Sequence, residues 1–351
     1  MRLNEPSWWY QPKPSATARA LRPLSALYGW AAERRIKSAK PEQVAVPVIC
    51  VGNLVAGGTG KTPLTIAIVR ELIRLGERPA ILTRGYGGRT TAPRWVDAVA
   101  DTAAEVGDEP LLLAEHAPTL VCRDRVRGAQ MMLDATQPCS VIVMDDGLQN
   151  PSLAKNLRFA VVDSRRGVGN GEVLPSGPLR APLAFQFDLV DAILVNHPPM
   201  HGDSAGPSEV AAWLKQNFPG PVLEGTPQAS SEADWVNGAR VVAFAGIANP
   251  QRFFNLLGKL GADVAETITL PDHHAFTEKD AERIIALAWR HGALPVTTEK
   301  DRVRLRSATG QRGLLWEQCR SVGIDLVLTD RDASRLTALI NTALTTHRSK
   351  R

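Results

Sequence analysis

Short apolar runs alternate with segments of helical periodicity along this 351-residue chain from residue 44 onward. In the first half of the chain we expect strands at 44–52, 78–88, 140–146, 158–163 and 191–196. The segment 63–76 carries Leu64, Ile68, Leu72 and Leu75 on one helical face. Strands that are apolar throughout are typical of a parallel sheet covered on both faces by helices. The sequence therefore predicts an α/β fold built on such a sheet.

A glycine-rich loop, GGTGKT at 57–62, joins the first strand to the first of these helices. Glycines let main-chain N–H groups wrap phosphates, Lys61 supplies a charge for the β- and γ-phosphates, and Thr62 offers a hydroxyl to Mg²⁺. The usual pattern has glycine where Val55 stands, so the loop is the variant with a tight G-G-x-G-K-T core. The sequence predicts an ATP and Mg²⁺ site at Val55, Ala56, Gly57, Gly58, Thr59, Gly60, Lys61 and Thr62.

Two adjacent acids, Asp145 and Asp146, end the apolar run at 140–146. P-loop enzymes place an acid at a strand end to hold Mg²⁺, directly or through water. Neighbouring side chains on a strand point in opposite directions, so we expect one of the two to face the metal. The sequence does not decide which.

A second strand–helix series follows a Pro-, Gly- and Ser-rich stretch after residue 196, and it predicts a second, smaller α/β domain. We expect its elements at 239–261, 282–292, 293–301 and 324–330. The expected division of the chain is an N-terminal segment 1–40, a P-loop domain 41–200, a linker region 201–235, the second domain 236–332, and a C-terminal helix with a basic tail 333–351. The sequence leaves open which domain the C-terminal helix packs on.

Residues 1–40 are basic, with eight Lys or Arg including Arg2 against two acids. Leu24, Leu27, Tyr28 and Ala31 share one helical face, with Trp30 beside it. A basic amphipathic helix edged by Trp and Tyr suits the bilayer interface or an amphipathic ligand. The alternative is a helix packed on its own domain. We expect Pro23 to begin or break this helix, because proline removes a main-chain donor.

The composition of the chain argues against nucleic-acid binding, membrane-spanning and secreted proteins. A net charge of +5 is too small to indicate nucleic-acid binding. The sequence has no apolar run of the roughly 20 residues that span a bilayer and no signal-peptide pattern, so we expect a protein of the cytoplasmic side, dissolved or peripherally bound. The four cysteines are widely spaced, and we expect them to be reduced structural residues.

A set of motifs stands in a fixed order: GNLVAGGTGKTP (52–63), LTRGYGG (82–88), VGDEPLLLA (106–114), DDGLQN (145–150), VVDSRRGVGNGEVLPSGPLR (161–180), PDHHAF (271–276) and TTEKD (297–301). In this combination the chain resembles the tetraacyldisaccharide 4′-kinases over most of its length. The resemblance implies transfer of the ATP γ-phosphate to the 4′-hydroxyl of a tetraacyl glucosamine disaccharide 1-phosphate, forming lipid IVA in lipid A biosynthesis. It also implies a peripheral enzyme on the cytoplasmic face of the bacterial inner membrane, with no nucleic acid and no obligate protein partner.

The resemblance also assigns residue roles. Asp108 matches the family's catalytic aspartate, and His273 looks like the histidine that pairs with it. A sugar hydroxyl is a poor nucleophile, so a carboxylate within reach accepts its proton while a histidine orients or tunes that carboxylate. Arg180 is a candidate for holding phosphate or developing charge, and Arg84 is a weaker one. Glu109 is a candidate to assist the metal or the nucleotide.

Two positions depart from the family pattern. Asn150 stands where the family usually has His, and Ala181 stands where it commonly has Glu. Asparagine exchanges hydrogen bonds but carries no charge near neutral pH, and alanine removes the carboxylate altogether. Because the loop, Asp108 and His273 are intact, we still expect an active kinase.

Two other classes compete with the kinase. A nucleotide-switch ATPase or GTPase of the partitioning or targeting type shares the G-G-x-G-K-T core, but it leaves DDGLQ, LPSGPLR and PDHH unexplained. A peripheral membrane scaffold that binds nucleotide without chemistry is suggested by the changes at Asn150 and Ala181.

Overall fold

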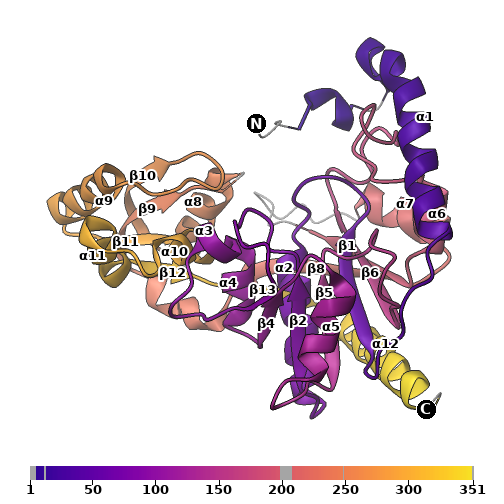
Figure 1. Cartoon of the computed structure of the whole chain (residues 1–351). Coiled ribbons are helices and arrows are strands. Elements are labelled where there is room, and N and C mark those ends of the chain that lie inside the picture. The colour runs from indigo at the N-terminus through magenta and orange to yellow at the C-terminus, as the bar shows by residue number, and fades with distance from the viewer. Residues whose placement is uncertain (1–4, 12, 198–207, 248, 350–351) are drawn as a thin grey trace. The chain divides into compact units, whose positions relative to one another are not determined.

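The computed structural model describes residues 5–11, 13–197, 208–247 and 249–349, so Arg2 and most of the Pro- and Ser-rich stretch lie outside the described residues. The chain forms two compact units (Figure 1). Unit 1 is assembled from Met1–Arg84, Asp124–Pro227 and Leu326–Arg351, and unit 2 from Gly85–Arg123 and Gln228–Asp325. This division differs from the expected consecutive domains, because residues 85–123 leave the first domain and the C-terminal residues return to it.

Unit 1 contains a parallel sheet with the strand order β8-β7-β6-β1-β5-β2. Its strands are β1 (Val48–Asn53), β2 (Pro79–Thr83), β5 (Val141–Asp145), β6 (Leu157–Asp163), β7 (Ala192–Asn196) and β8 (Val222–Ala229). Every residue of β1, β2, β5 and β7 is buried, which explains why these strands are apolar up to the polar residue that ends each of them. The α/β fold expected from the sequence is confirmed.

The helices of unit 1 are η1 (Ser7–Tyr10), α1 (Ala16–Lys37), α2 (Lys61–Arg74), α5 (Arg125–Leu133), α6 (Leu183–Asp188), α7 (Glu209–Asn217) and α12 (Asp330–Ser349). The predicted apolar face of α2 is buried at Leu64, Ile68 and Leu72. The C-terminal helix α12, yellow in Figure 1, packs in unit 1, where Thr337 Oγ1 donates a hydrogen bond to Glu71 of α2. This answers the question that the sequence left open.

The expected linker is partly wrong. Residues 201–207 lie outside the described part of the chain, but the following residues form α7, β8 and η2 (Ser231–Val236). Leu214, Phe218 and Val222 join a buried core cluster with residues of β6 and β7. The spacing of these apolar residues, which begins directly after the Pro- and Ser-rich stretch, indicates a packed segment. The composition of that stretch indicates a loop, and it was extended too far along the chain.

The expectation for Pro23 is also wrong, because α1 runs through this residue from Ala16 to Lys37. A proline inside a helix costs one main-chain hydrogen bond. Tertiary contacts hold the helix on the C-terminal side of the proline. Ser25 is buried and its Oγ donates to Ser176 Oγ at 2.7 Å, and Gly29 lies against Pro182.

Unit 2 is built on a second, four-stranded parallel sheet with the order β10-β9-β11-β12. Its strands are β9 (Arg240–Ala245), β10 (Asp263–Thr269), β11 (Leu294–Thr298) and β12 (Arg320–Val322), and β3 (Arg94–Trp95) pairs antiparallel with β4 (Thr119–Val121). Its helices are α3 (Ala103–Val106), α4 (Asp108–Ala114), α8 (Pro250–Lys259), α9 (Glu278–His291), α10 (Glu299–Leu305) and α11 (Gly310–Gln318), and β13 (Ile324–Leu328) leads the chain back to unit 1. Alternate residues of β9 enter two core clusters, so the sheet is covered on both faces.

Candidate active site

The phosphate loop connects the end of β1 to the start of α2, and two of its glycines are required by the backbone. Gly57 and Gly60 have φ angles of 96° and 84°, a region that favours glycine. A Cβ at Gly57 would lie 1.8 Å from the Glu5 carboxylate, and one at Gly60 would lie 2.2 Å from the Asn196 amide nitrogen. A Cβ at Gly58 would meet no heavy atom within 4 Å among the described residues. The loop is therefore closely packed at Gly57 and Gly60 and open at Gly58.

Two buried asparagines brace this loop from neighbouring strand ends. Asn53, the last residue of β1, donates to the Gly57 carbonyl at 3.0 Å and accepts a hydrogen bond from the Thr59 hydroxyl. Asn196, the last residue of β7, donates to the Thr59 carbonyl at 2.9 Å. Neither asparagine was predicted from the sequence, although each is a polar residue that ends a wholly buried strand. Their hydrogen bonds hold the loop in shape.

The strand-end acid Asp146 lies opposite the cations of the phosphate site. Lys61 Nζ is 3.7 Å and Arg180 Nη1 is 2.8 Å from Asp146 Oδ1. The neighbouring Asp145 instead accepts a hydrogen bond from Thr83 at 3.3 Å through Oδ2. Burial acts to raise the pKa of Asp146, but the charges of Lys61 and Arg180 outweigh it and hold that pKa below its usual value. Of the two acids, Asp146 is therefore the one that faces Lys61.

Arg180 contacts both the phosphate loop and Asp146. Its Nε donates to the Val55 carbonyl at 3.1 Å, and its Nη1 also lies 3.3 Å from Gln149 Oε1. The weaker candidate Arg84 is exposed directly after β2, and its charge adds to the lowering of the Asp146 pKa. The structure thus brings together Lys61, Asp146 and Arg180 from three separate motifs.

The predicted metal residues of unit 1 fit Mg²⁺ in their chemistry. Thr62 in the first turn of α2 is buried beside the loop. Asp145 ends β5, which pairs with β1, and Asp146 directly follows that strand. Hydroxyl and carboxylate oxygens suit this hard cation, which usually keeps waters and substrate phosphates as its other ligands. Among the described residues, no group of three or more His, Cys, Asp or Glu side chains is arranged so that it could hold a metal ion by itself. Glu109, in unit 2, pairs with Lys300 at 2.8 Å.

The predicted base and its histidine are in direct contact in unit 2. Asp108 begins α4, and His273 follows β10 in the PDHH segment with a φ angle of 55°. His273 Nδ1 lies 2.7 Å from Asp108 Oδ2, and the His273 main-chain N–H donates to the Gly246 carbonyl at 2.9 Å. A non-glycine residue with positive φ typically costs about 1–3 kcal/mol and is often found at functional sites.

Arg304 completes this cluster and was missed by the sequence analysis. This residue of α10 is nearly buried, and its Nη2 and Nε donate to Asp108 Oδ2 at 2.6 and 3.1 Å. Its Nη1 donates to Asp301 at 2.7 Å and to the Gly246 carbonyl at 2.8 Å. The available signal was the spacing of Lys300 and Arg304, four residues apart on one face of a helix that begins inside the TTEKD motif.

Asp108 is ionised at neutral pH in this setting. Burial acts to raise its pKa, but the hydrogen bond from His273 and the charge of Arg304 more than offset that effect, and the pKa lies well below its usual value. Because an ionised carboxylate only accepts hydrogen bonds, His273 Nδ1 carries the shared proton.

Asn150 and Ala181, the two departures from the family pattern, make hydrogen bonds with residues close to them in the sequence. Asn150 Oδ1 accepts hydrogen bonds from the Ser152 main-chain N–H at 2.9 Å and hydroxyl at 2.7 Å, so it stabilises the turn after β5. Ala181 is fully buried, and its carbonyl accepts a hydrogen bond from Gln186 at 2.8 Å. Neither side chain replaces the charge that the usual family residue would bring.

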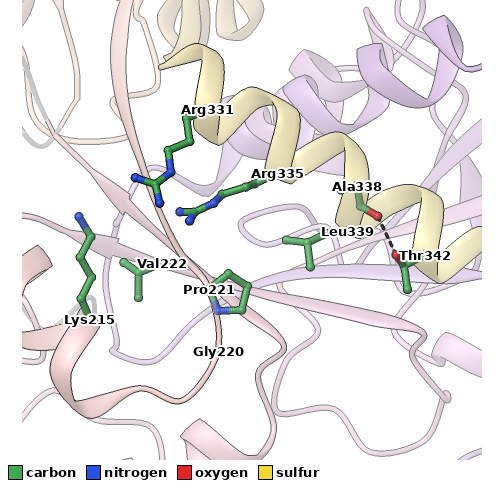
Figure 2. A pocket seen from close by; sticks show the side chains of 9 residues that line it. All are labelled: Lys215, Gly220, Pro221, Val222, Arg331, Arg335, Ala338, Leu339 and Thr342. Atoms are coloured by element: carbon green, nitrogen blue, oxygen red, sulfur yellow. Dashed lines mark hydrogen bonds between the residues drawn. The ribbon is translucent and has the colours of Figure 1, made fainter.

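A pocket of about 530 Å³ lies elsewhere in unit 1 (Figure 2). Its basic side chains are Lys215 of α7 and Arg331 and Arg335 of α12. It adjoins Gly220–Val222 at the amino end of β8, whereas the phosphate loop follows the carboxyl end of the parallel strand β1. Lys215 pairs with Glu224, and Arg335 lies 3.5 Å from Asp332, so two of the three cations have acidic partners. This pocket contains none of the predicted site residues.

The apolar face predicted for α1 is turned to solvent. Leu24, Leu27 and Trp30 are 58%, 61% and 58% exposed, and Tyr28 is also exposed. The helix does pack on unit 1, but through its small residues Ala18, Ser25 and Gly29. Within the described ranges, no helix is both long enough and apolar enough to cross a bilayer.

The loop joins a buried strand to a helix, and its lysine faces the acid that follows a neighbouring strand. This arrangement is that of the P-loop phosphotransferases of the α/β class. A family model described as tetraacyldisaccharide-1-P 4′-kinase matches residues 17–345. The chain belongs to this kinase family. The resemblance seen in the sequence is therefore confirmed, and the nucleotide switch is not favoured.

Similar proteins agree with this assignment. The tetraacyldisaccharide 4′-kinase of Rhodopseudomonas palustris (strain HaA2) is 47% identical over 313 residues, covering 89% of each chain. That of Methylobacterium sp. (strain 4-46) is 48% identical over 310 residues, covering 87% of this chain and 90% of its own. A crystal structure described as the "apo" form of LpxK from Aquifex aeolicus in complex with ATP shares the fold, with a TM-score of 0.72 and 24% identity over 93% of this chain and 99% of that one.

Proposed function

We propose that this kinase transfers the γ-phosphate of ATP to the 4′-hydroxyl of a tetraacyldisaccharide 1-phosphate, forming lipid IVA at the cytoplasmic face of the inner membrane. The observation that carries the proposal is the buried, ionised Asp108 hydrogen-bonded to His273 at 2.7 Å. A nucleotide switch or a scaffold has no need of a base for a sugar hydroxyl, whereas a kinase does.

Unit 1 supplies the groups for the phosphate donor. The main-chain N–H groups of the loop and the Lys61 ammonium group bind the β- and γ-phosphates. Lys61 and Arg180 now face the Asp146 carboxylate, and the triphosphate gives both cations a second anionic partner. Thr62 and the acids Asp145 and Asp146 would hold Mg²⁺, which neutralises negative charge on the phosphates when it is bound.

Unit 2 supplies the proton acceptor. The 4′-oxygen forms a bond to the γ-phosphorus while the bond from that phosphorus to the β,γ-bridging oxygen breaks and ADP leaves. The hydroxyl proton passes to the Asp108 carboxylate as the new bond forms. Because its pKa is low, Asp108 is a weak base that orients the hydroxyl and takes the proton late, when the oxygen has become acidic.

The exposed apolar face of α1 supports a lipid acceptor and peripheral membrane binding. Leu24, Leu27 and Trp30 give a surface for acyl chains, while Arg34 and Arg35 follow on the same helix. Each basic residue near an anionic membrane surface contributes roughly 1 kcal/mol.

Transfer can be tested directly with purified protein, Mg²⁺, γ-labelled ATP and the tetraacyldisaccharide 1-phosphate, with the product resolved by mass. We expect the acceptor to gain one phosphate in an ATP-dependent reaction. Nucleotide hydrolysis that does not depend on the acceptor and is stimulated by protein or DNA would support a nucleotide switch. Nucleotide binding with no transfer at all would support a scaffold.

A further inference from the structure

The Arg304 guanidinium group divides its hydrogen bonds between two carboxylates and one carbonyl. Nε and Nη2 donate to Asp108, and Nη1 donates to Asp301 and to the Gly246 carbonyl. One cation thereby joins the first residue of α4, the helix α10 and the loop after β9. The Arg304 side chain is 6% exposed, so water does not screen these contacts strongly.

These contacts distinguish the two oxygens of Asp108. Oδ2 receives three N–H groups, one from His273 Nδ1 and two from Arg304. Oδ1 receives the Glu109 main-chain N–H at 3.1 Å. Among the described residues, Oδ2 thus accepts three hydrogen bonds and Oδ1 accepts one, so Oδ1 has more remaining capacity to accept a hydrogen bond. Oδ1 is therefore the oxygen that we assign to the acceptor hydroxyl.

We infer that Arg304 is a positioning residue for phosphate transfer, which holds Asp108 so that Oδ1 accepts the hydroxyl proton. This inference rests on the proposed function. Nothing in the motifs assigned such a role to Arg304. The charged groups around Asp108 are His273 from the PDHH segment, Arg304, Asp301 and Lys300 from α10, and the adjacent Glu109.

The test compares Arg304→Met, Arg304→Lys and the control Arg302→Met. Arg302 lies on the same helix, but its guanidinium group stacks 4.3 Å from the Trp316 ring. We expect Arg304→Met to lower kcat about ten- to a hundredfold, with KM for ATP unchanged. Arg304→Lys keeps the charge and one N–H donor group near Asp108, so it should recover part of the kcat that Arg304→Met loses, again with KM for ATP unchanged.

Several outcomes would overturn the inference. Wild-type kcat in either Arg304 variant would show that the guanidinium group does not position Asp108. If Arg304→Met does not fold, the kcat of Arg304→Lys is the measurement that tests this role. An equal loss in Arg302→Met would show a general effect on α10. Asp108→Asn separates this inference from the proposed function. If Asp108→Asn is fully active, Asp108 is not the base. If Asp108→Asn is inactive while Arg304→Met has wild-type activity, Asp108 remains the base and only the role of Arg304 is excluded.

Discussion

The Lys61 ammonium group lies 3.7 Å from the Asp146 carboxylate, so the cation that we propose for phosphate binding has an anionic partner within the protein. Arg180 reaches the same oxygen at 2.8 Å. This arrangement keeps two cations in place beside the loop without leaving a buried charge unpaired.

Replacing Lys61 with methionine should weaken ATP binding and reduce transfer strongly, because a point charge on the β- and γ-phosphates is lost. We expect a drop in kcat/KM of about a hundredfold or more. Arg74→Met on the exposed end of the same helix is the control, since its guanidinium group pairs with Glu71. Equal activity of the two variants would contradict the assignment of Lys61.

Asp108→Asn should reduce kcat by about 10²–10⁴, the usual contribution of a positioned base, with nucleotide binding preserved. Steady-state kinetics and a separate nucleotide-binding titration measure the two quantities. Asp263→Asn, an exposed acid paired with Arg240, serves as the control. Wild-type turnover in Asp108→Asn would show that another group accepts the proton.

Gly57→Ala and Gly58→Ala make a matched pair for the shape of the loop. At Gly57 an alanine needs a left-handed backbone, which costs about 1–2 kcal/mol, and its Cβ would collide with Glu5. We therefore expect Gly57→Ala to lower the melting temperature of the ligand-free protein and Gly58→Ala to leave it unchanged. Equal melting temperatures would mean that the loop relaxes freely.

The exposed face of α1 can be tested without disturbing its packed face. We expect the triple change Leu24→Ser, Leu27→Ser and Trp30→Ser to reduce binding to anionic vesicles and to raise KM for the lipid acceptor, with KM for ATP unchanged. Trp289→Ser removes an aromatic side chain that is 87% exposed on α9 and is the control. Vesicle binding equal to that of the wild type would exclude this face as the lipid surface.

Acid should weaken the contribution of Asp108 to stability. Its folded-state pKa lies below the unfolded value near 3.9, so its contribution is complete above that value and is lost as the pH falls toward the folded-state pKa. Urea unfolding of the wild type and Asp108→Asn should therefore differ most near neutral pH and converge as the pH falls below about 4. A constant difference across this range would contradict the lowered pKa.

Much of the fold could be predicted because the positions that are buried in a strand or a helix are occupied by apolar residues with a recognisable spacing. Strands that are buried on both faces, such as β5 and β7, are apolar up to their last residue, and the helical period of α2 marks its buried face. The assignment of residues 85–123 to unit 2 leaves no such trace, because it depends on contacts such as Val106 and Leu111 with Val303. Pro23 was misjudged for a similar reason, since the contact of Ser25 with Ser176 joins residues 151 positions apart.

The candidate site shows the same limit. The phosphate loop and the strand-end acids could be predicted because each is a short local pattern. Arg304 is 196 positions from Asp108, and Asn196 is 137 positions from Thr59. Such pairs depend on how the strands are ordered in the sheets, which no local pattern in one sequence encodes.

The Gly246 carbonyl has a mechanical consequence for the base. It accepts hydrogen bonds from Arg304 Nη1 at 2.8 Å and from the His273 main chain at 2.9 Å, so both partners of Asp108 are anchored to one atom. Any displacement of this loop carries the two anchors in the same direction, and the spacing between them is preserved. The histidine and the arginine that contact Asp108 therefore keep a fixed spacing relative to each other.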